Sequence, residues 1–296
     1  MKIIVTGSAG FIGSHIAAKY RALGHDVIDI DLRAKKARNI CDEEAMRRLF
    51  LREKPDIVSH HAGVIEVVKS IENPRATFEA NVLGTINLLQ AAGKAGTVKR
   101  FIFPSSYTVY GEPAKLPVDE TTAIAPISPY GLSKVMAEEA IRFYGKLYGF
   151  AHMIFRYPNI YGPGQDGNGA VGAIAIFAER MRQGKAPVIF GDGSKTRDYV
   201  HIDDIVRLNA LALRAKASGT FCIGTAREVS DERVFAEVKK HMEFPETPTY
   251  MAHRYGEVRN ISVSGKEAEA ALGFKPRISF ETGVRNYLRG TRKGTA

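Results

Sequence analysis

Residues 2–13 of the chain read Lys-Ile-Ile-Val-Thr-Gly-Ser-Ala-Gly-Phe-Ile-Gly, a short apolar run that leads into three glycines. The apolar run predicts a strand, and the pattern of residues 11–23 predicts a helix. Gly7, Gly10 and Gly13 allow a tight turn between them and let the backbone approach a pyrophosphate closely. The free N–H groups at the helix start would then face the anion. The spacing is GxxGxxG rather than GxGxxG, but its place at a strand-to-helix junction predicts a dinucleotide-binding turn.

Short apolar strands and amphipathic helices alternate through the first half of the chain. The expected strands are Ile3–Thr6, Val27–Ile30, Asp56–Ser59, Arg100–Phe103 and His152–Phe155, and the expected helices are Phe11–Leu23, Glu43–Arg52, Ala76–Ala95 and Tyr130–Tyr148. Repeated βα units predict a parallel sheet, and right-handed crossovers place helices on both of its faces. The expected fold class is therefore α/β, with a Rossmann-type doubly wound parallel sheet.

The sequence pattern changes after about Arg156: from there on, the expected helices and strands are shorter and are separated by glycine-rich turns. We expect residues 1–158 to form the dinucleotide-binding domain, with some later elements returning to it. We expect residues 159–296 to form a smaller α/β substrate-binding lobe. Its expected elements are helices near 172–183 and 203–215 and a strand at 188–190.

Composition and charge indicate which ligands and which cellular location to expect for this protein. The formal net charge of the 296 residues is +10, but Lys and Arg are spread along the chain without interleaved aromatics, which argues against nucleic acid. A pocket for an anionic ligand and a merely solvated surface both stay open as explanations of the charge. No apolar run approaches about 18 residues, so no membrane span is expected. Residues 1–7 go directly into a strand and a turn, so no signal peptide is expected. Cys41 and Cys222 lack disulfide or metal-site spacing, which favours the reducing cytoplasm and no bound metal.

Asp31 ends the second expected strand, 18 residues after Gly13. A carboxylate at this place can accept hydrogen bonds from the adenosine ribose and repel a 2′-phosphate, which favours NAD over NADP. Arg33, Lys35 and Lys36 follow closely and could instead hold that phosphate, so NADP stays open as an alternative at this point.

Tyr130 and Lys134 are four residues apart in an expected helix, so their polar ends can converge on one face. A nearby ammonium is expected to lower the pKa of the phenol, which could then exchange protons with a substrate hydroxyl. The same lysine could hydrogen-bond the nicotinamide ribose. Ser105 and Ser106 end a strand upstream, where α/β sheets carry their chemistry.

These motifs resemble the extended short-chain dehydrogenase/reductase family, and within it the UDP-glucose 4-epimerases, over essentially the whole chain. The similar segments are Thr6–His15, Asn39–Ile40, His60–Val64, Asn81–Thr85, Ser105–Gly111, Ser128–Lys134, Arg156–Pro163, Phe190–Gly193, Thr196–His201 and Arg254–Arg259. The order and spacing of these segments, more than any one of them, make the resemblance specific. The chain departs from the family pattern at Asn39, Pro104, Tyr107 and Gly164, which bear on the adenine contact and the sugar pocket.

The resemblance implies NAD as the cofactor and a catalytic set of Ser106, Tyr130 and Lys134. The cofactor-binding residues that it implies are Gly7, Gly10, Phe11, Ile12, Gly13, Asp31, Asn39, Ile40, His61, Ala62, Gly63, Asn81, Tyr130, Lys134, Tyr157 and Pro158. The implied substrate-binding residues are Ser106, Tyr130, Asn159, Arg197 and Arg254, with Asn159 and both arginines on the substrate diphosphate.

The resemblance also implies a reaction and an assembly. The expected enzyme is an isomerase that epimerises C4 of a nucleotide sugar through a transient 4-keto intermediate. The dehydratases and decarboxylases of the family usually carry an acid after the strand-end Ser or Thr, and Tyr107 and Thr108 stand there instead. A 4-keto-sugar reductase, a dehydratase and, more remotely, a non-catalytic NAD-binding protein stay open. UDP-glucose/UDP-galactose, the N-acetylhexosamine and the uronate analogues all stay open as substrates.

A homodimer is expected because the helices at 76–95 and 130–148 carry apolar residues on more than one face. These residues are Phe78, Val82, Ile86, Leu89, Val135, Ile141, Phe143 and Leu147. One face of each helix can cover the sheet while another meets a partner, and the family commonly pairs through a four-helix bundle.

Overall fold

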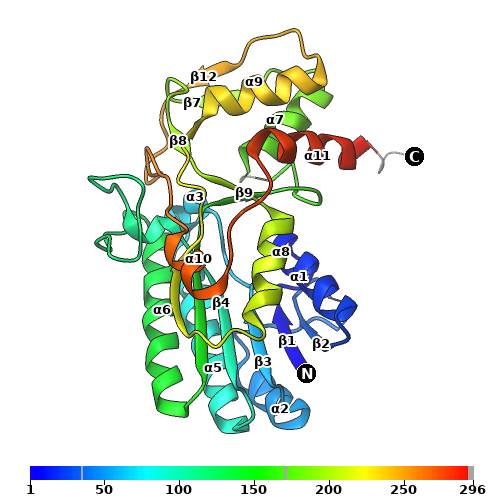
Figure 1. The fold of residues 1–296 in the computed structure, drawn as a ribbon, viewed down its shortest axis with the longest axis vertical. Helices are drawn as coiled ribbons and strands as arrows, with labels where there is room; N and C mark the ends of the chain where they lie inside the picture. Colours follow the sequence, from blue (N-terminus) through cyan, green and yellow to red (C-terminus); the bar gives the residue numbers. More distant parts are fainter. Residues whose placement is uncertain (35, 170–171, 293–296) are drawn as a thin grey trace.

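The computed structural model describes residues 1–34, 36–169 and 172–292, which form two lobes (Figure 1). The lower lobe in that view is built on a six-stranded sheet, ordered β10-β5-β4-β3-β1-β2, in which every pairing is parallel. Its strands are β1 (Lys2–Thr6), β2 (Asp26–Ile30), β3 (Ile57–His60), β4 (Arg100–Ser106), β5 (Ala151–Tyr157) and β10 (Gly219–Cys222). The expected α/β class with a doubly wound parallel sheet is confirmed.

Helices cover both faces of this sheet. On one face α1 (Phe11–Ala22) packs against α8 (Ile202–Ala212), and their apolar sides join one buried core. On the other face α2 (Glu43–Glu53), α5 (Gly84–Ala95) and α6 (Pro129–Tyr148) lie side by side over a second core. Because both faces are covered, the inner strands are continuous apolar runs rather than alternating ones.

Local capping decides where α6, the helix of Tyr130, begins and ends. Ser128 precedes the helix, and its hydroxyl accepts a hydrogen bond from the N–H of Gly131. Pro129 occupies the first turn, where the missing N–H costs nothing. Gly149 ends the helix with φ at 76°, a left-handed conformation that favours glycine. The sequence therefore places Tyr130 in the first turn of a helix of defined length.

The helix expected at 76–95 is interrupted, and this part of the prediction is wrong in detail. α4 (Pro74–Phe78) and α5 are joined by a π-helical turn, η1 (Glu79–Leu83), and an additional helix, α3 (Val67–Glu72), precedes them. The π turn changes which side chains of this segment face the sheet. It needs no unusual residue type, so the apolar periodicity of the sequence did not reveal that the helix is interrupted.

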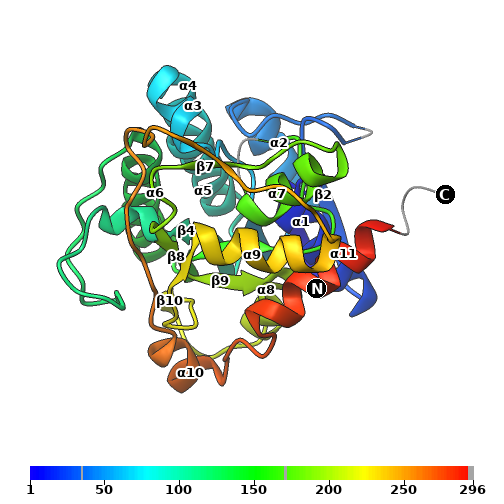
Figure 2. The same cartoon turned by 90° about the horizontal axis from the view of Figure 1, so that it is seen from above.

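The upper lobe contains α7 (Ala173–Arg182), α9 (Asp231–Met242) and α11 (Phe280–Arg292), which lie above the sheet in Figure 2. Its short strands pair as β6 (Asn159–Tyr161) with β9 (Tyr199–His201), β7 (Val188–Phe190) with β12 (Thr249–Met251), and β8 (Thr196–Arg197) with β11 (Val229–Ser230). The remaining elements are the 3₁₀ turn η2 (Tyr107–Tyr110) and α10 (Lys266–Leu272).

The chain returns from the upper lobe to the lower one. β10 adds to the sheet beside β5, α8 covers α1, and α10 packs on β10. The division of the chain at residue 158 stays a prediction. No helix in the described part of the chain is long and apolar enough to cross a bilayer.

Candidate active site

A cavity of about 500 Å³ lies between the lobes, over the end of the sheet to which the parallel strands point. From β1 the chain continues to β2 on one side and then to β3 on the other, so the connections diverge beside β1. α/β sheets bind their ligands at such a point. The expected site residues that line the cavity are Phe11, Ile12, His61, Gly63, Ser106, Tyr130, Lys134, Tyr157, Pro158, Asn159, Arg197 and Arg254.

The glycine turn borders this cavity and fits a dinucleotide. Gly7 has φ at 66°, and a Cβ atom there would lie 2.7 Å from the backbone nitrogen of Ala62. A Cβ atom at Gly13 would lie 2.1 Å from the carbonyl oxygen of Gly7, so the turn requires glycine at both places. Gly10 precedes α1 and offers no side chain to cap it. The first N–H groups of α1, those of Phe11 and its neighbours, can therefore meet a phosphate.

Asp31 is 8% exposed and holds this turn in place. Its Oδ2 accepts a hydrogen bond from the N–H of Ala9 at 3.0 Å, and its Oδ1 accepts one from the N–H of Arg33 at 2.8 Å. A carboxylate in this position disfavours a 2′-phosphate, in keeping with NAD. The side chains of Arg33 and Lys36 are exposed, and Lys35 lies outside the described residues.

Three of the residues expected to bind the cofactor, Asn39, Ile40 and Asn81, are not among the residues that line the cavity. Asn39 is exposed, and its Oδ1 accepts from the N–H of Cys41. Ile40 is buried in the core beneath α5. Asn81 in the π turn is 3% exposed. Its Oδ1 accepts a hydrogen bond from the N–H of Val64 at 2.7 Å. Its Nδ2 donates hydrogen bonds to the carbonyl oxygen of Val64 and to Oγ of Ser133, both at 2.9 Å. Asn81 thus fastens the loop at 63–64 to the helix of Lys134.

Lys134 is almost buried, and its ammonium lies beside the end of β4. Nζ donates a hydrogen bond to the carbonyl oxygen of Pro104 at 2.9 Å and lies 4.6 Å from the centre of the Phe103 ring. Burial lowers the pKa of Lys134 to about 8, and the negative charge of Glu138 acts in the opposite direction. Near neutral pH the side chain is therefore a cation beside the ring of Tyr130, whose centre is 5.8 Å away.

The expected depression of the Tyr130 pKa is not found in this structure. Burial raises the pKa of the phenol to about 12, and a hydrogen bond with Ser106 only partly offsets this. Desolvation disfavours the tyrosinate, and the neighbouring Tyr107 acts in the same direction. Tyr130 is held at the start of α6 by its N–H, which donates to Ser70 Oγ on α3 at 3.1 Å.

The two histidines at the end of β3, His60 in the strand and His61 directly after it, stay neutral. His60 is fully buried between the hydroxyls of Thr6 and Thr85, and its pKa lies well below the usual value because of burial and the nearby Lys134. His61 lines the cavity, and the same causes lower its pKa to about 3. Its Nε2 bonds Ser59 Oγ, whereas its buried Nδ1 has no partner among the described residues.

The opposite end of the cavity is cationic. Arg197 is 6% exposed, and its Nη1 donates to the carbonyl oxygens of Thr196 and Arg259 at 2.7 and 2.9 Å. Asp198 is turned away and accepts from Thr225. Within the described ranges no carboxylate lies within 4.0 Å of the Arg197 guanidinium, and the negative charges of Glu257 and Asp231 act on it only from further away.

Arg254 is more open than Arg197. Its guanidinium stacks on the Phe190 ring at 3.6 Å and lies 3.7 Å from Glu257. Lys195, which also lines the cavity, pairs with Glu257 at 2.8 Å and with Asp231 at 3.4 Å. Asn159 begins β6 at the border between the lobes and faces the same cavity.

Four further cavity residues were missed by the sequence analysis. Glu66, Thr108, Gln165 and Tyr199 each line the cavity and carry a buried oxygen that lacks a partner among the described residues. They come from four different segments, so only the folded chain brings them together. The position of Thr108 beside Ser106 was the one available signal.

Comparisons with known proteins agree with this geometry. The model of the NAD dependent epimerase/dehydratase family matches residues 3–224. A Methanocaldococcus jannaschii protein, provisionally named a UDP-glucose 4-epimerase, is 41% identical with 97% of each chain covered. The dTDP-glucose 4,6-dehydratase 1 of Escherichia coli is 32% identical, covering 99% of this chain and 94% of its own.

Two solved structures share the whole fold. The UDP-glucose 4-epimerase of Thermotoga maritima with UDP-glucose has a TM-score of 0.95 and 38% identity, with 100% of both chains covered. The UDP-glucose 4-epimerase of Thermus thermophilus in complex with NAD has a TM-score of 0.91 and 33% identity over 100% of both chains. With a dinucleotide turn, a buried Ser-Tyr-Lys set and a family model that covers most of its length, the chain belongs to the NAD-dependent epimerase/dehydratase family.

Proposed function

We propose that this protein is an NAD-dependent nucleotide-sugar 4-epimerase, with a UDP-hexose as its substrate. One observation carries the proposal: a single cavity joins Ser106, Tyr130 and Lys134 at the sheet to Arg197 and Arg254 in the other lobe. The first group suits proton exchange at a sugar hydroxyl, and the second suits a diphosphate. A sugar linked to a nucleotide diphosphate has both chemical groups, separated by the length of the sugar.

The residues proposed to hold NAD comprise the glycine turn with Phe11 and Ile12, Asp31 with Asn39 and Ile40, the segment His61–Gly63, Asn81, Tyr157–Pro158, Tyr130 and Lys134. Of these, the cavity is lined by Phe11, Ile12, His61, Gly63, Tyr130, Lys134, Tyr157 and Pro158. When bound, NAD supplies a reversible hydride acceptor whose oxidised ring carries a positive charge. A cation beside a phenol favours the tyrosinate, which would oppose the effect of burial on the pKa of Tyr130.

Tyr130 is the proposed proton-transfer group. Its tyrosinate form takes the proton from the C4 hydroxyl when the sugar is oxidised, and the phenol so formed returns that proton to the C4 oxygen when the 4-keto group is reduced. Ser106 lines the same cavity as Tyr130, and its hydroxyl donates to the oxygen on C4. Lys134 orients the ribose of the cofactor and keeps a positive charge next to the phenol. Inversion at C4 requires that the keto sugar turns over before reduction, while Arg197 and Arg254 keep hold of the diphosphate.

The residues after Ser106 favour epimerisation over dehydration. Tyr107 and Thr108 are buried or half-buried in η2 beside the cavity, and neither is a carboxylic acid. Elimination of water from the sugar needs an acid and a base near C5 and C6. Tyr107 and Thr108 can instead bind sugar hydroxyls, since the Thr108 hydroxyl is buried and has no partner in the described structure.

A homodimer through α6 and α5 is part of the proposal. Leu132, Met136, Phe143 and Leu147 lie on one face of α6 and are between 43% and 63% exposed, and Leu83 before α5 is 54% exposed. α5 packs against α6, so these side chains form one apolar surface that a second copy of the chain can cover. Of the apolar residues that predicted two faces on these helices, Val82, Leu89 and Ile141 are buried, whereas Phe143 and Leu147 are exposed.

We also propose a cytoplasmic location, which is supported by the two unpaired cysteines, Cys41 and Cys222. The test of function is a screen of nucleotide sugars with separation of the C4 epimers and with no NAD added beyond what the protein retains. Interconversion of one epimer pair is expected, without net NADH. Release of a 4-keto-6-deoxy sugar would assign a dehydratase, and no turnover of any nucleotide sugar would refute the proposal.

A further inference from the structure

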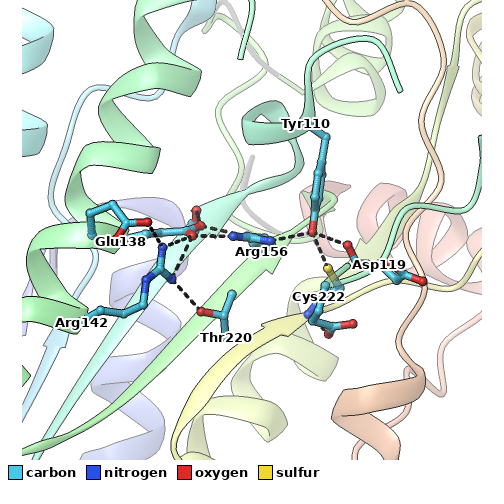
Figure 3. Close-up of polar contacts among 10 residues, drawn as sticks. Tyr110, Asp119, Glu138, Arg142, Arg156, Thr220 and Cys222 are labelled. Carbon is cyan, nitrogen blue, oxygen red and sulfur yellow. Dashed lines mark hydrogen bonds and ion pairs between the residues drawn. The ribbon is translucent and has the colours of Figure 1, made fainter. Parts of the chain in front are cut away.

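The carboxylate of Glu138 is the centre of a buried polar cluster behind the cavity (Figure 3). Its Oε1 accepts hydrogen bonds from Ser105 Oγ at 2.5 Å and from Arg156 Nε at 3.0 Å, and its Oε2 accepts one from Arg156 Nη2 at 2.7 Å. Arg142 adds longer contacts at 3.4 Å. Glu138 is 1% and Arg156 7% exposed, so this two-point pair is shielded from water and fixes both side chains in one geometry.

The cluster joins the segments that carry the catalytic set. Ser105 precedes Ser106 in β4, and Arg156 lies opposite Ser105 in the neighbouring strand β5. Glu138 is four residues after Lys134 and therefore lies one turn further along the same face of α6. Lys134 in turn bonds the end of β4 through Nζ. Helix α6 is thus tied to β4 at two successive turns, and the position of Ser106 relative to Lys134 depends on both ties.

The guanidinium of Arg156 also makes a hydrogen bond on the side that faces away from Glu138. Its Nη1 donates to the hydroxyl of Tyr110 at 2.9 Å, and that hydroxyl donates to the carbonyl oxygen of Asp119 at 2.8 Å. The Tyr110 oxygen also lies 2.9 Å from Cys222 Sγ in β10 (Figure 3). Arg156 therefore cannot move toward or away from Glu138 without breaking contacts to η2 and to β10.

We propose that Glu138 is a positioning residue, which fixes Ser106 and Lys134 relative to Tyr130 through Ser105 and Arg156. It lies behind the cavity and acts only through these partners. The role rests on the proposed function, because its kinetic consequence is measured as epimerisation. A displacement of about 1 Å between reacting groups can cost on the order of a hundredfold in rate, so a network that sets this distance has a large effect from behind the site.

Glu138 also sets the charge around Lys134. The titratable groups around the Lys134 ammonium are Tyr130 and Glu138 on α6 and His60 and His61 at the end of β3. Both histidines are neutral near pH 7, since burial and the ammonium keep their pKa values low. The charge of Glu138 raises the pKa of Lys134 against the effect of burial. Loss of that charge should lower this pKa further, so that the ammonium is lost at a lower pH.

The decisive variant is Glu138→Gln, which keeps the shape and one acceptor oxygen but removes the charge. We expect kcat to fall by about a hundredfold with little change in KM, and the alkaline limb of the pH profile to move to lower pH. The matched control is Asp204→Asn. Asp204 is 2% exposed, accepts hydrogen bonds from Arg207 and from the N–H groups of residues 277 and 278, and is not among the residues that line the cavity. This variant should lose stability but keep the kcat and pH profile of the parent protein.

Two measurements keep the proposal testable if Glu138→Gln does not fold or if no substrate is found. Arg156→Lys keeps the buried cation but loses the two-point grip, and we expect a similar fall in kcat with unchanged KM. Titration of ¹³C-labelled Lys134 by NMR, assigned with Lys134→Arg, reports the pKa in Glu138→Gln without any turnover. The proposal would be overturned if Glu138→Gln and Arg156→Lys both kept the wild-type kcat. It would also be overturned if neither the pKa of Lys134 nor the alkaline limb of the pH profile moved in Glu138→Gln. Failure of the wild type to epimerise any sugar would refute the function alone.

Discussion

Replacement of Arg197 by alanine should weaken UDP binding far more than replacement of Arg254. A guanidinium has five N–H donors, and Arg197 uses both of those on Nη1 for the carbonyl oxygens of Thr196 and Arg259. This leaves the donors on Nε and Nη2 for an anion, in the paired arrangement that suits phosphate oxygens. Arg197 is 6% exposed and has no carboxylate partner among the described residues, so water and counter-charge compete little for it.

The size of the effect follows from these contacts. Hydrogen bonds to charged groups contribute about 1.5–3 kcal/mol, and the buried Arg197 should lie in the upper part of this range. A loss of about 2–3 kcal/mol raises Kd for UDP roughly 30- to 150-fold. The side chain of Arg254 is 35% exposed and forms an ion pair with Glu257. We therefore expect the Kd for UDP to rise only about fivefold in Arg254→Ala, in keeping with the small contribution of exposed ion pairs.

Isothermal titration of UDP into Arg197→Ala, Arg254→Ala and Arg259→Ala would measure these differences. Arg259 lies in the same loop as Arg254 but its side chain is exposed, and Arg197 contacts only its carbonyl, so Arg259→Ala should bind UDP normally. The NAD content of all three proteins should stay the same, because the glycine turn is in the other lobe. Equal UDP affinity in Arg197→Ala and in Arg259→Ala would show that the diphosphate binds elsewhere.

Four other predictions test the remaining parts of the site and assembly. Tyr130→Phe should lower kcat about 10²- to 10⁴-fold while chromatography still recovers bound NAD; a variant with a tenth of the wild-type rate would exclude the phenol as the proton-transfer group. In the wild type, kcat should fall as pH rises through about 8, where Lys134 loses its proton, and a rate that stays constant to pH 10 would contradict this. Light scattering should give twice the 32.5 kDa chain mass for the wild type and a monomer for Phe143→Glu combined with Leu147→Glu; a monomeric wild type would rule out the dimer. Glu66→Gln should raise the turnover of UDP-glucuronate relative to UDP-glucose, since Glu66 carries a buried, unpartnered oxygen in the cavity, and an unchanged ratio would place Glu66 away from the sugar.

Much of the sheet and of the cofactor turn could be predicted from local patterns. An apolar run followed by glycines defines β1 and the start of α1, and Ser128 with Pro129 defines the start of α6, because the causes lie within a few residues of each other. The pairing of Tyr130 with Lys134 follows from helical spacing in the same way. Such features depend on short-range geometry, which a single sequence contains.

The remainder depends on contacts between distant segments. The π turn around Asn81 is stabilised by bonds to Val64 and Ser133, neither of which is near it in sequence. The raised pKa of Tyr130 comes from burial, which depends on packing of the complete fold rather than on the lysine one turn away. The position of Glu66 in the cavity likewise follows from how α3 packs against α6. Patterns within one segment contain no information on these distances.

The return of the chain to the sheet has a consequence for biosynthesis. β5 acquires its outer neighbour only when Gly219–Cys222 has been made, more than sixty residues after β5 itself ends at Tyr157. Until that segment leaves the ribosome, the edge of β5 is open to pairing with other chains, and the apolar side of α1 lacks the cover of α8. A nascent chain halted near residue 158 is therefore an aggregation hazard rather than a finished domain, and its folding has to be completed together with the upper lobe.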